Sequence, residues 1–167
     1  MMKDKVMNIE KYLDKQDILV LAGLRKNARE KLTTISRRIQ LPVSTIYDRM
    51  AHLSKTVIKK KTILLDFSRI GYNTRIILVL KVQREQRDEV KKFLLKSENL
   101  NNLYKINNGF DFLCEMVFEH VKDMEDFIED FETKFKVLHR DTHYIIDEIE
   151  RECFLDQDRM FIKNKMI

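Results

Sequence analysis

The apolar positions between residues 32 and 53 follow helical spacing in two short runs. In the first run, Ile35 and Ile39 are four residues apart, which places them on one face of a helix. Pro42 then interrupts the pattern, because proline cannot continue a helix interior. The second run predicts a helix from about residue 44 to residue 53, with an apolar stripe formed by Ile46, Met50 and Leu53.

Two short helices joined by a tight turn, the second with a polar outer face, form the helix-turn-helix arrangement that enters a DNA major groove. An ordinary helical hairpin with a solvated polar face has the same pattern, so this stretch alone does not distinguish a DNA-binding motif from such a hairpin. A preceding helix is predicted after Asp14, an N-cap candidate with Asp17 near the positive helix end. The apolar run 18–21 is also typical of a strand, but we expect a helix because Ile35 and Ile39 need a cover.

A basic stretch follows the second helix. Val57-Ile58 and Ile63–Leu65 flank Lys59, Lys60 and Lys61, which predicts a two-stranded β wing or a single strand leaving the helices. Lysines beside a DNA-reading helix would lie near phosphates, where they add affinity and salt dependence but read no sequence. The alternative is a solvated charged turn.

The second half alternates between strand and helix patterns. We expect strands at residues 75–82, 103–106, 110–118 and 142–149, and helices at 87–96 and 123–135. The order β-α-β-β-α-β is the ferredoxin-like motif, an antiparallel sheet with both helices on one face, so the fold class is α+β. Apolar residues also point to the other sheet face, which predicts that a second copy of the chain covers it as a homodimer.

The expected domains are a helix-turn-helix domain with an N-terminal extension at 1–56, a wing or hinge linker at 57–73, a ferredoxin-like dimerisation and sensing domain at 74–150, and a tail at 151–167. Residues 1–12 are expected to form an extra helix or an arm. The tail is expected to continue as a strand, with Met160, Phe161 and Ile162 buried.

Composition and charge narrow the class of protein. With 44% hydrophobic and 35% charged residues the chain is of the folded globular type. Residues 1–73 carry 16 Lys/Arg against 7 Asp/Glu, and residues 74–167 carry 16 against 20. A basic first half favours a polyanionic partner, although a membrane surface or RNA would also fit. Two cysteines and the lack of a signal or membrane-span pattern favour the cytoplasm.

Short motifs along residues 13–150 carry a resemblance in their joint order and spacing, although none is specific alone. They are Leu13-Asp14-Lys15-Gln16-Asp17, Leu21, Leu24, Asn27-Ala28-Arg29, Leu41, Ser44-Thr45-Ile46, Arg49, Leu53, Ile58, Leu65-Asp66, Gly71 and Phe110-Asp111-Phe112-Leu113. In this arrangement the chain resembles the Lrp/AsnC, or feast/famine, family of transcriptional regulators, and we expect an archaeal member. The resemblance implies a winged helix-turn-helix, a β hinge, a ferredoxin-like sensing domain, and dimers that associate further into octamers.

The resemblance also implies roles for individual residues. Those placed on the groove-facing helix are Ser44, Thr45, Tyr47, Asp48, Arg49 and His52, and those placed on the DNA backbone are Arg37, Arg38, Lys59, Lys60 and Lys61. Arg49 is equally placed to pair with Asp48 or Asp17. Pro42 stands where the family often has a capping Ser, and it supplies no side-chain acceptor.

The sensing loop departs further from the family. It reads Asn107-Asn108-Gly109-Phe110-Asp111, with Asn108 where Gly is common. Asn tolerates a left-handed backbone, so the loop can persist, but its side chain fills space that an effector such as an amino acid would need. Asp111 either binds a ligand amine or pairs with a strand neighbour. Effector contacts are expected from Asn107, Asn108, Gly109 and Asp111.

Two other functions compete with an effector-responsive regulator of double-stranded DNA. One is an architectural protein that wraps DNA without an effector. The other is an enzyme resembling sirohaem decarboxylases, with His139, Arg140, His143 and Tyr144 around a tetrapyrrole. The two histidines would lie too far apart along a strand for a ready zinc pair. We expect no enzyme, cofactor or metal, because catalytic motifs are missing and a decarboxylase needs no basic outer helices.

Overall fold

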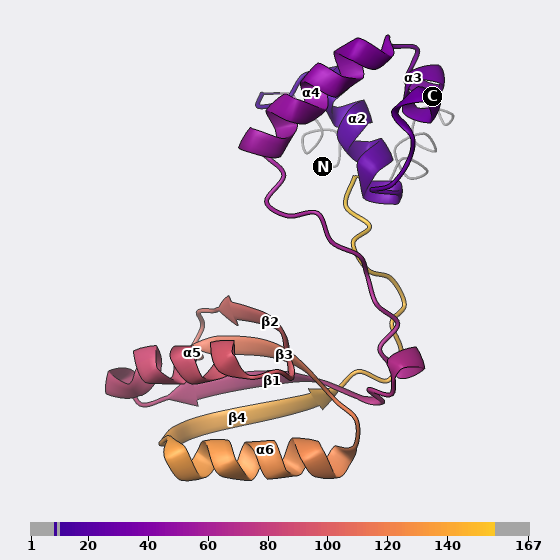
Figure 1. The fold of residues 1–167 in the computed structure, drawn as a ribbon. Coiled ribbons are helices and arrows are strands. Elements are labelled where there is room, and N and C mark those ends of the chain that lie inside the picture. The colour runs from indigo at the N-terminus through magenta and orange to yellow at the C-terminus, as the bar shows by residue number, and fades with distance from the viewer. Residues whose placement is uncertain (1–8, 10, 156–167) are drawn as a thin grey trace, which may run out of the picture. The chain divides into compact units, whose positions relative to one another are not determined.

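The computed structural model describes residue 9 and residues 11–155, so the expectations for residues 1–8 and for Met160, Phe161 and Ile162 lie outside the described residues. Two compact units divide the chain. The first holds the three helices of the N-terminal half and the chain from Glu150 onward, and the second holds residues 64–149 (Figure 1). Within the described residues, no helix is long and apolar enough to cross a membrane.

The helical unit contains α2 (Lys15–Lys26), α3 (Leu32–Ile39) and α4 (Val43–Thr56). The predicted cap is confirmed, because the Asp14 carboxylate accepts a 2.8 Å hydrogen bond from the Asp17 backbone N–H. The apolar run at residues 18–21 is helical, as expected, and covers the other two helices. The small core of this unit consists of the buried side chains of Val20, Leu21, Ile35, Ile46 and Leu53.

The turn between α3 and α4 is built from local signals. Gln40 adopts a left-handed conformation with φ 55°, which ends α3. The Ser36 hydroxyl donates a 2.5 Å hydrogen bond to the carbonyl of Leu41. Pro42 then serves as the N-cap of α4 and supplies no side-chain hydrogen bond. Proline has no backbone N–H that would need a partner at a helix start, and its fixed φ suits that position. It is therefore tolerated at the beginning of α4, although it would break the interior of a helix.

The β wing expected after α4 is not present in the described chain. Residues 58–66 form no strand, and the side chains of Ile63, Leu64 and Leu65 are 64%, 53% and 46% exposed. A strand needs a neighbour that accepts its backbone hydrogen bonds, and no other described segment of the chain pairs with this stretch. A 3-10 turn at Ser68–Ile70 follows, and Gly71 ends it with φ 95°, a conformation that glycine adopts readily.

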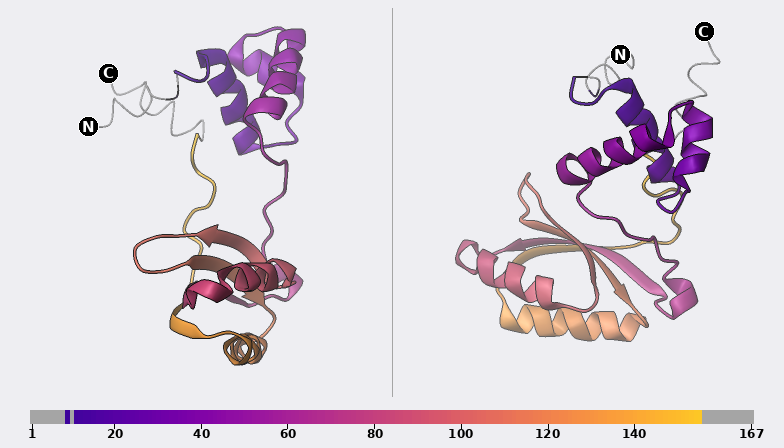
Figure 2. Two further views of the ribbon diagram at one scale, coloured as in Figure 1. Left: turned by 90° about the vertical axis from the view of Figure 1, so that its left-hand side faces the viewer. Right: turned by 45° about the horizontal axis from the view of Figure 1, so that its top comes forward.

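The second unit is a four-stranded antiparallel sheet with strand order β2-β3-β1-β4, which confirms the ferredoxin-like fold. Its strands are β1 (Thr74–Val82), β2 (Leu100–Lys105), β3 (Phe112–Phe118) and β4 (Val137–Tyr144), and its helices are α5 (Arg87–Lys96) and α6 (Val121–Lys134). Figures 1 and 2 show both helices on the same face of the sheet. A short 3-10 helix, Arg84–Gln86, leads into α5.

The sheet core lies between the strands and these two helices. Along β1 every second side chain is buried, from Thr74 to Val82, as strand geometry requires. Phe112, Cys114, Met116 and Phe118 of β3 join them on the same face. Burial raises the pKa of the Cys114 thiol to about 12, so this cysteine stays protonated and unreactive.

The last strand lies earlier than predicted. β4 covers Val137–Tyr144 rather than residues 142–149, and it pairs with β1 from Val82↔Val137 to Ile76↔Tyr144. Beyond it the side chains of Ile146 and Ile149 are 97% and 93% exposed. β4 is an edge strand with polar side chains on both faces, so its sequence lacks the apolar alternation by which a strand is recognised.

The described part of the tail does not continue as a strand. Residues 151–155 form turns and bends. They belong to the helical unit, where the Arg25 guanidinium donates to the Glu152 carboxylate at 2.7 Å and to the Phe154 carbonyl at 3.0 Å.

Candidate nucleic-acid interface

The outer face of α4 is the surface opposite its buried stripe. Ile46 and Leu53 are completely buried, and because residues advance by about 100° along a helix, the opposite side is defined by sequence spacing. Four side chains form its centre line: Ser44, Asp48, Ala51 and Lys55. Tyr47, 64% exposed, and His52 lie on its two flanks, whereas Thr45 is only partly exposed. Sequence reasoning missed Ala51 and Lys55, which the spacing from Ser44 and Asp48 would have identified.

Arg49 is not part of this outer face. Its guanidinium lies 2.7 Å from the Asp14 carboxylate and 2.6 Å from that of Asp17, and it donates to the Gln16 side chain at 2.5 Å. These partners belong to the start of α2. The hydrogen bonds that the Arg49 guanidinium donates to the Asp17 and Asp14 carboxylates raise the pKa of Arg49. The hydrogen bond that the Asp14 carboxylate accepts from the Asp17 backbone N–H, together with the one from Arg49, lowers the pKa of Asp14. Arg49 therefore ties α4 to α2, and Asp48 takes no part.

The two neighbouring arginines of α3 have different surroundings. Arg38 makes a bidentate pair with Glu30 at 2.7 and 2.6 Å, which is the strong planar geometry of a guanidinium and a carboxylate. Arg37 is exposed and has no ion-pair partner among the described residues. Of the two, only the guanidinium of Arg37 is free to bind an anion from outside the protein.

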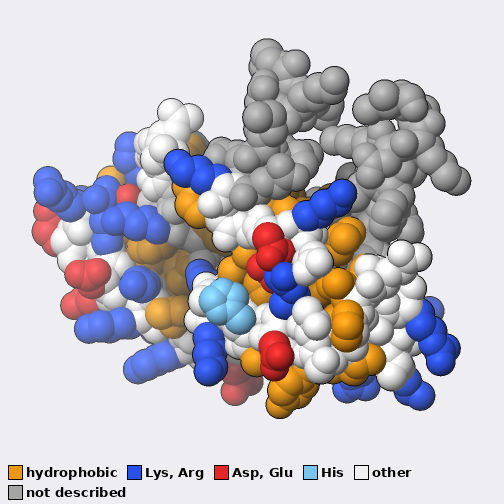
Figure 3. Space-filling model, turned by 90° about the horizontal axis from the view of Figure 1, so that it is seen from above, with side chains coloured by type: hydrophobic (Ala, Val, Ile, Leu, Met, Phe, Trp, Pro, Cys, Tyr) orange, Lys and Arg blue, Asp and Glu red, His pale blue; other side chains and the backbone are white. Residues whose placement is uncertain are grey.

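Further free cations surround the helical unit. Lys59, Lys60 and Lys61 are all exposed, although not on a wing, and residues 11–63 carry 13 Lys/Arg against 4 Asp/Glu. Figure 3 shows Lys and Arg side chains exposed around this unit, with few acidic ones among them. A surface with this charge attracts a polyanion.

The expected effector residues are brought together, but they are not equivalent. Asn108 and Gly109 have φ of 62° and 93°, so Asn does tolerate the left-handed turn here. Asp111 is buried, and its carboxylate accepts from the Val82 backbone N–H at 3.0 Å and lies 2.7 Å from Arg87. Because these contacts occupy Asp111, the exposed side chains of Asn107 and Asn108 are the polar groups of this loop that remain for a ligand.

The residues of the enzyme hypothesis do not form one site. His139 and His143 project from the open face of β4, whereas Arg140 and Tyr144 project from the other. His139 lies 3.1 Å from Asp141, and Arg140 lies 2.7 Å from Glu132. The described residues contain no group of three or more His, Cys, Asp or Glu side chains suited to a metal ion.

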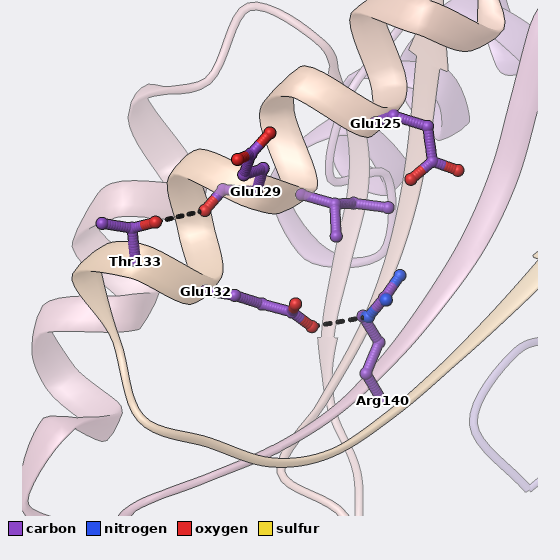
Figure 4. A pocket seen from close by; sticks show the side chains of 6 residues that line it. Glu125, Glu129, Glu132, Thr133 and Arg140 are labelled. Atoms are coloured by element: carbon purple, nitrogen blue, oxygen red, sulfur yellow. Dashed lines mark hydrogen bonds and ion pairs between the residues drawn. The ribbon is translucent and has the colours of Figure 1, made fainter.

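An open depression lies between α6 and β4 (Figure 4). Its lining residues are Glu125, Ile128, Glu129, Glu132, Thr133 and Arg140. The single cation, Arg140, is paired with Glu132, and the Thr133 hydroxyl donates to the Glu129 carbonyl at 2.8 Å. With three carboxylates around it, this depression does not suit a nucleic acid or an anionic cofactor.

Comparison with known proteins shows to which protein family the chain belongs. No family model matches the chain. An HTH-type transcriptional regulator of Pyrococcus abyssi is 30% identical over 122 residues, which are 71% of this chain and 79% of the relative. Another from the same organism is 24% identical over 145 residues, covering 86% of this chain and 99% of the relative. LrpC of Bacillus subtilis superposes with a TM-score of 0.75 at 24% identity, covering 83% of this chain and 97% of LrpC. The chain belongs to the Lrp/AsnC family.

As an Lrp/AsnC member, the chain is a DNA-binding transcriptional regulator, and its relatives are named as regulators and not as enzymes. The fold is shared with Escherichia coli AsnC, with a TM-score of 0.73, 15% identity, and coverage of 83% of this chain and 96% of AsnC. It is also shared with a Neisseria meningitidis regulator solved as a complex with L-methionine, with a TM-score of 0.77, 19% identity, and coverage of 83% and 93%.

Proposed function

We propose that α4 lies in the major groove of the operator and that Arg37 and Lys59–Lys61 contact phosphates on either side of it. The observation that carries this proposal is the exposed polar face of a 14-residue helix whose opposite stripe is buried at Ile46 and Leu53, surrounded by cations without internal partners among the described residues. Base edges are read from the groove, whereas phosphate contacts set the register of the protein. Arg38 and Arg49, although expected at the interface, are engaged within the protein and are left out of it.

The Arg37→Ala and Arg38→Ala variants form a matched pair that tests this assignment. Each phosphate contact adds about 0.9 to the slope of log affinity against log salt, because binding releases a counterion. We expect Arg37→Ala to lower the slope by about 1 and Arg38→Ala to leave it nearly unchanged, since Arg38 is paired with Glu30. Fluorescence anisotropy titrations of one duplex between 50 and 200 mM salt measure both slopes. Equal slopes for the two variants would contradict the phosphate role of Arg37.

We further propose that the open face of the sheet packs against a second copy of the chain. Ile77 and Val79 of β1 and Leu113 of β3 lie on this face, opposite the helices, and are only partly buried. Polar side chains, among them His139 and His143, lie at its β4 edge. The same face carries Arg75 and Glu115, which form an ion pair with each other. Apolar side chains beside polar groups that have partners are the usual composition of a symmetric interface between subunits.

A pair of leucine variants tests this interface. Leu113→Arg is expected to shift the protein to the monomer, because an unpaired guanidinium in an apolar interface is poorly solvated. Leu95→Arg is the control, since Leu95 is 57% exposed on α5 and makes the same change in charge away from the open face. Sedimentation velocity reports the mass of each. A Leu113→Arg protein that keeps the wild-type mass would exclude this face.

A further inference from the structure

Asp48 differs from the other acidic residues between residues 11 and 63. Residues 11–63 contain four carboxylates: Asp14, Asp17, Glu30 and Asp48. Arg49 binds the first two and Arg38 binds the third, at 2.6–2.7 Å. The carboxylate of Asp48 is exposed and has no ion-pair or hydrogen-bond partner among the residues that the structure describes. Among residues 11–63 it is the single carboxylate without such a partner, in a stretch that carries 13 Lys/Arg.

The helix itself gives Asp48 no structural role. The residues three and four positions away on either side are Ser44, Thr45, Ala51 and His52, so no Lys or Arg is within reach of an intrahelical pair. The helix dipole stabilises a carboxylate within the first turn of a helix. Asp48 is the sixth residue of α4 and lies beyond that turn. A carboxylate at the centre of a face that approaches phosphates weakens binding unless it makes a specific contact.

The other side chains of this face narrow what that contact is. Arginine bound to the O6 and N7 atoms of guanine is the commonest specific contact in the major groove, but Arg49, the only arginine of α4, is tied to α2. An ionised carboxylate only accepts hydrogen bonds, so it pairs with exocyclic amino groups and is repelled by the acceptor atoms of guanine and thymine. Adenine presents an acceptor, N7, beside its amino group, whereas cytosine presents its amino group alone.

We propose that Asp48 reads the N4 amino group of a cytosine in each operator half-site. This inference rests on the proposed placement of α4 in the major groove. Its neighbours on the centre line fit the same role, because Ser44 both donates and accepts and the Ala51 methyl suits a thymine methyl. The free cations Arg37 and Lys59–Lys61 supply the affinity that the negative charge of Asp48 removes.

The first step of the test selects binding sites from random duplexes with the full-length wild-type protein. The second is a double-mutant cycle on the selected site. One partner is the Asp48→Ala protein, and the other is DNA in which the conserved cytosine is replaced by 2-pyrimidinone, which lacks only the N4 amino group. We expect this replacement to weaken wild-type binding about 5- to 150-fold, the range for one good base contact. Asp48→Ala should bind both duplexes within twofold.

Two controls distinguish this contact from other causes. The same replacement at a cytosine outside the selected positions is expected to have no effect on either protein. Asp48→Asn keeps the size of the side chain but can also donate, so selection with this variant should exchange the cytosine for adenine, which Asn recognises through N6 and N7. Circular dichroism melting of both variants should match the wild type, because Asp48 makes no contact within the described structure.

Failure of this inference is distinguishable from failure of the proposed placement of α4. If the wild type selects sites without a conserved cytosine, or if Asp48→Ala still requires the N4 amino group, Asp48 is not the reader of cytosine. The placement of α4 survives both results provided that Tyr47→Ala or Ser44→Ala changes the selected sequence. If none of the variants on this face alters the selection, while all bind duplex DNA at low salt, the placement of α4 is itself overturned.

Discussion

Replacing Arg49 by methionine is expected to lower the free energy of unfolding of the helical unit by about 2 to 3 kcal/mol. The change removes three hydrogen bonds to side chains of α2 and leaves Asp17, whose side chain is only 13% exposed, without its cation. Breaking a buried ion pair costs about 3 to 5 kcal/mol, and the 23% exposure of the Arg49 side chain moderates that cost. Hydrogen exchange of the amides of α2, α3 and α4 measures the loss directly.

Arg37→Met is the matched control for this experiment. It removes the same charge from a neighbouring helix, but Arg37 has no partner among the described residues, so the stability of the unit should not change. The two variants should therefore have different effects. Arg49→Met should lose protection from hydrogen exchange, and Arg37→Met should lose part of the salt dependence of DNA binding. If Arg49→Met kept wild-type protection while it changed the selected operator sequence, Arg49 would be a groove residue after all.

Replacing Lys59, Lys60 and Lys61 together by alanine is expected to have the largest effect on DNA binding. Three lost phosphate contacts lower the slope of log affinity against log salt by about 2.7. Between 50 and 200 mM salt the wild type should therefore lose about 40-fold more affinity than the variant. Because phosphates carry no sequence information, the preference between operator and random duplex should stay the same.

A second triple variant controls for net charge. Lys91, Lys92 and Lys96 are exposed on α5, in the sheet unit, and their replacement by alanine makes the same change in charge away from the proposed interface. Its salt slope should match that of the wild type. Equal slopes for both triple variants would mean that the lysines after α4 are the solvated charged turn that the sequence also allowed.

The sequence predicted best where the signal is local. The stripe of Ile46 and Leu53 repeats within one helix, and the Asp14 cap involves an N–H three residues away. The sequence predicted strand positions less well, because a strand forms only where a neighbouring segment pairs with it. The final strand was placed too late because β4 is an edge strand with polar side chains on both of its faces. The apolar residues after Tyr144 suggested instead a strand that the sheet does not pair. The prediction of a β wing was wrong for the same reason, since residues 58–66 lack a pairing segment within the described chain.

The sequence by itself determined the order of helices and strands, the ferredoxin-like topology and the concentration of positive charge in the first half, because periodicity and composition are properties of the chain. Only the tertiary structure decided which charges are available to DNA. Arg38 and Arg49 look equivalent to Arg37 in the sequence, but Glu30 is eight residues from Arg38, and Asp14 and Asp17 are 35 and 32 residues from Arg49. Folding brings these carboxylates to the two guanidiniums and leaves Arg37 and Asp48 free, since an ion pair depends on distance in space.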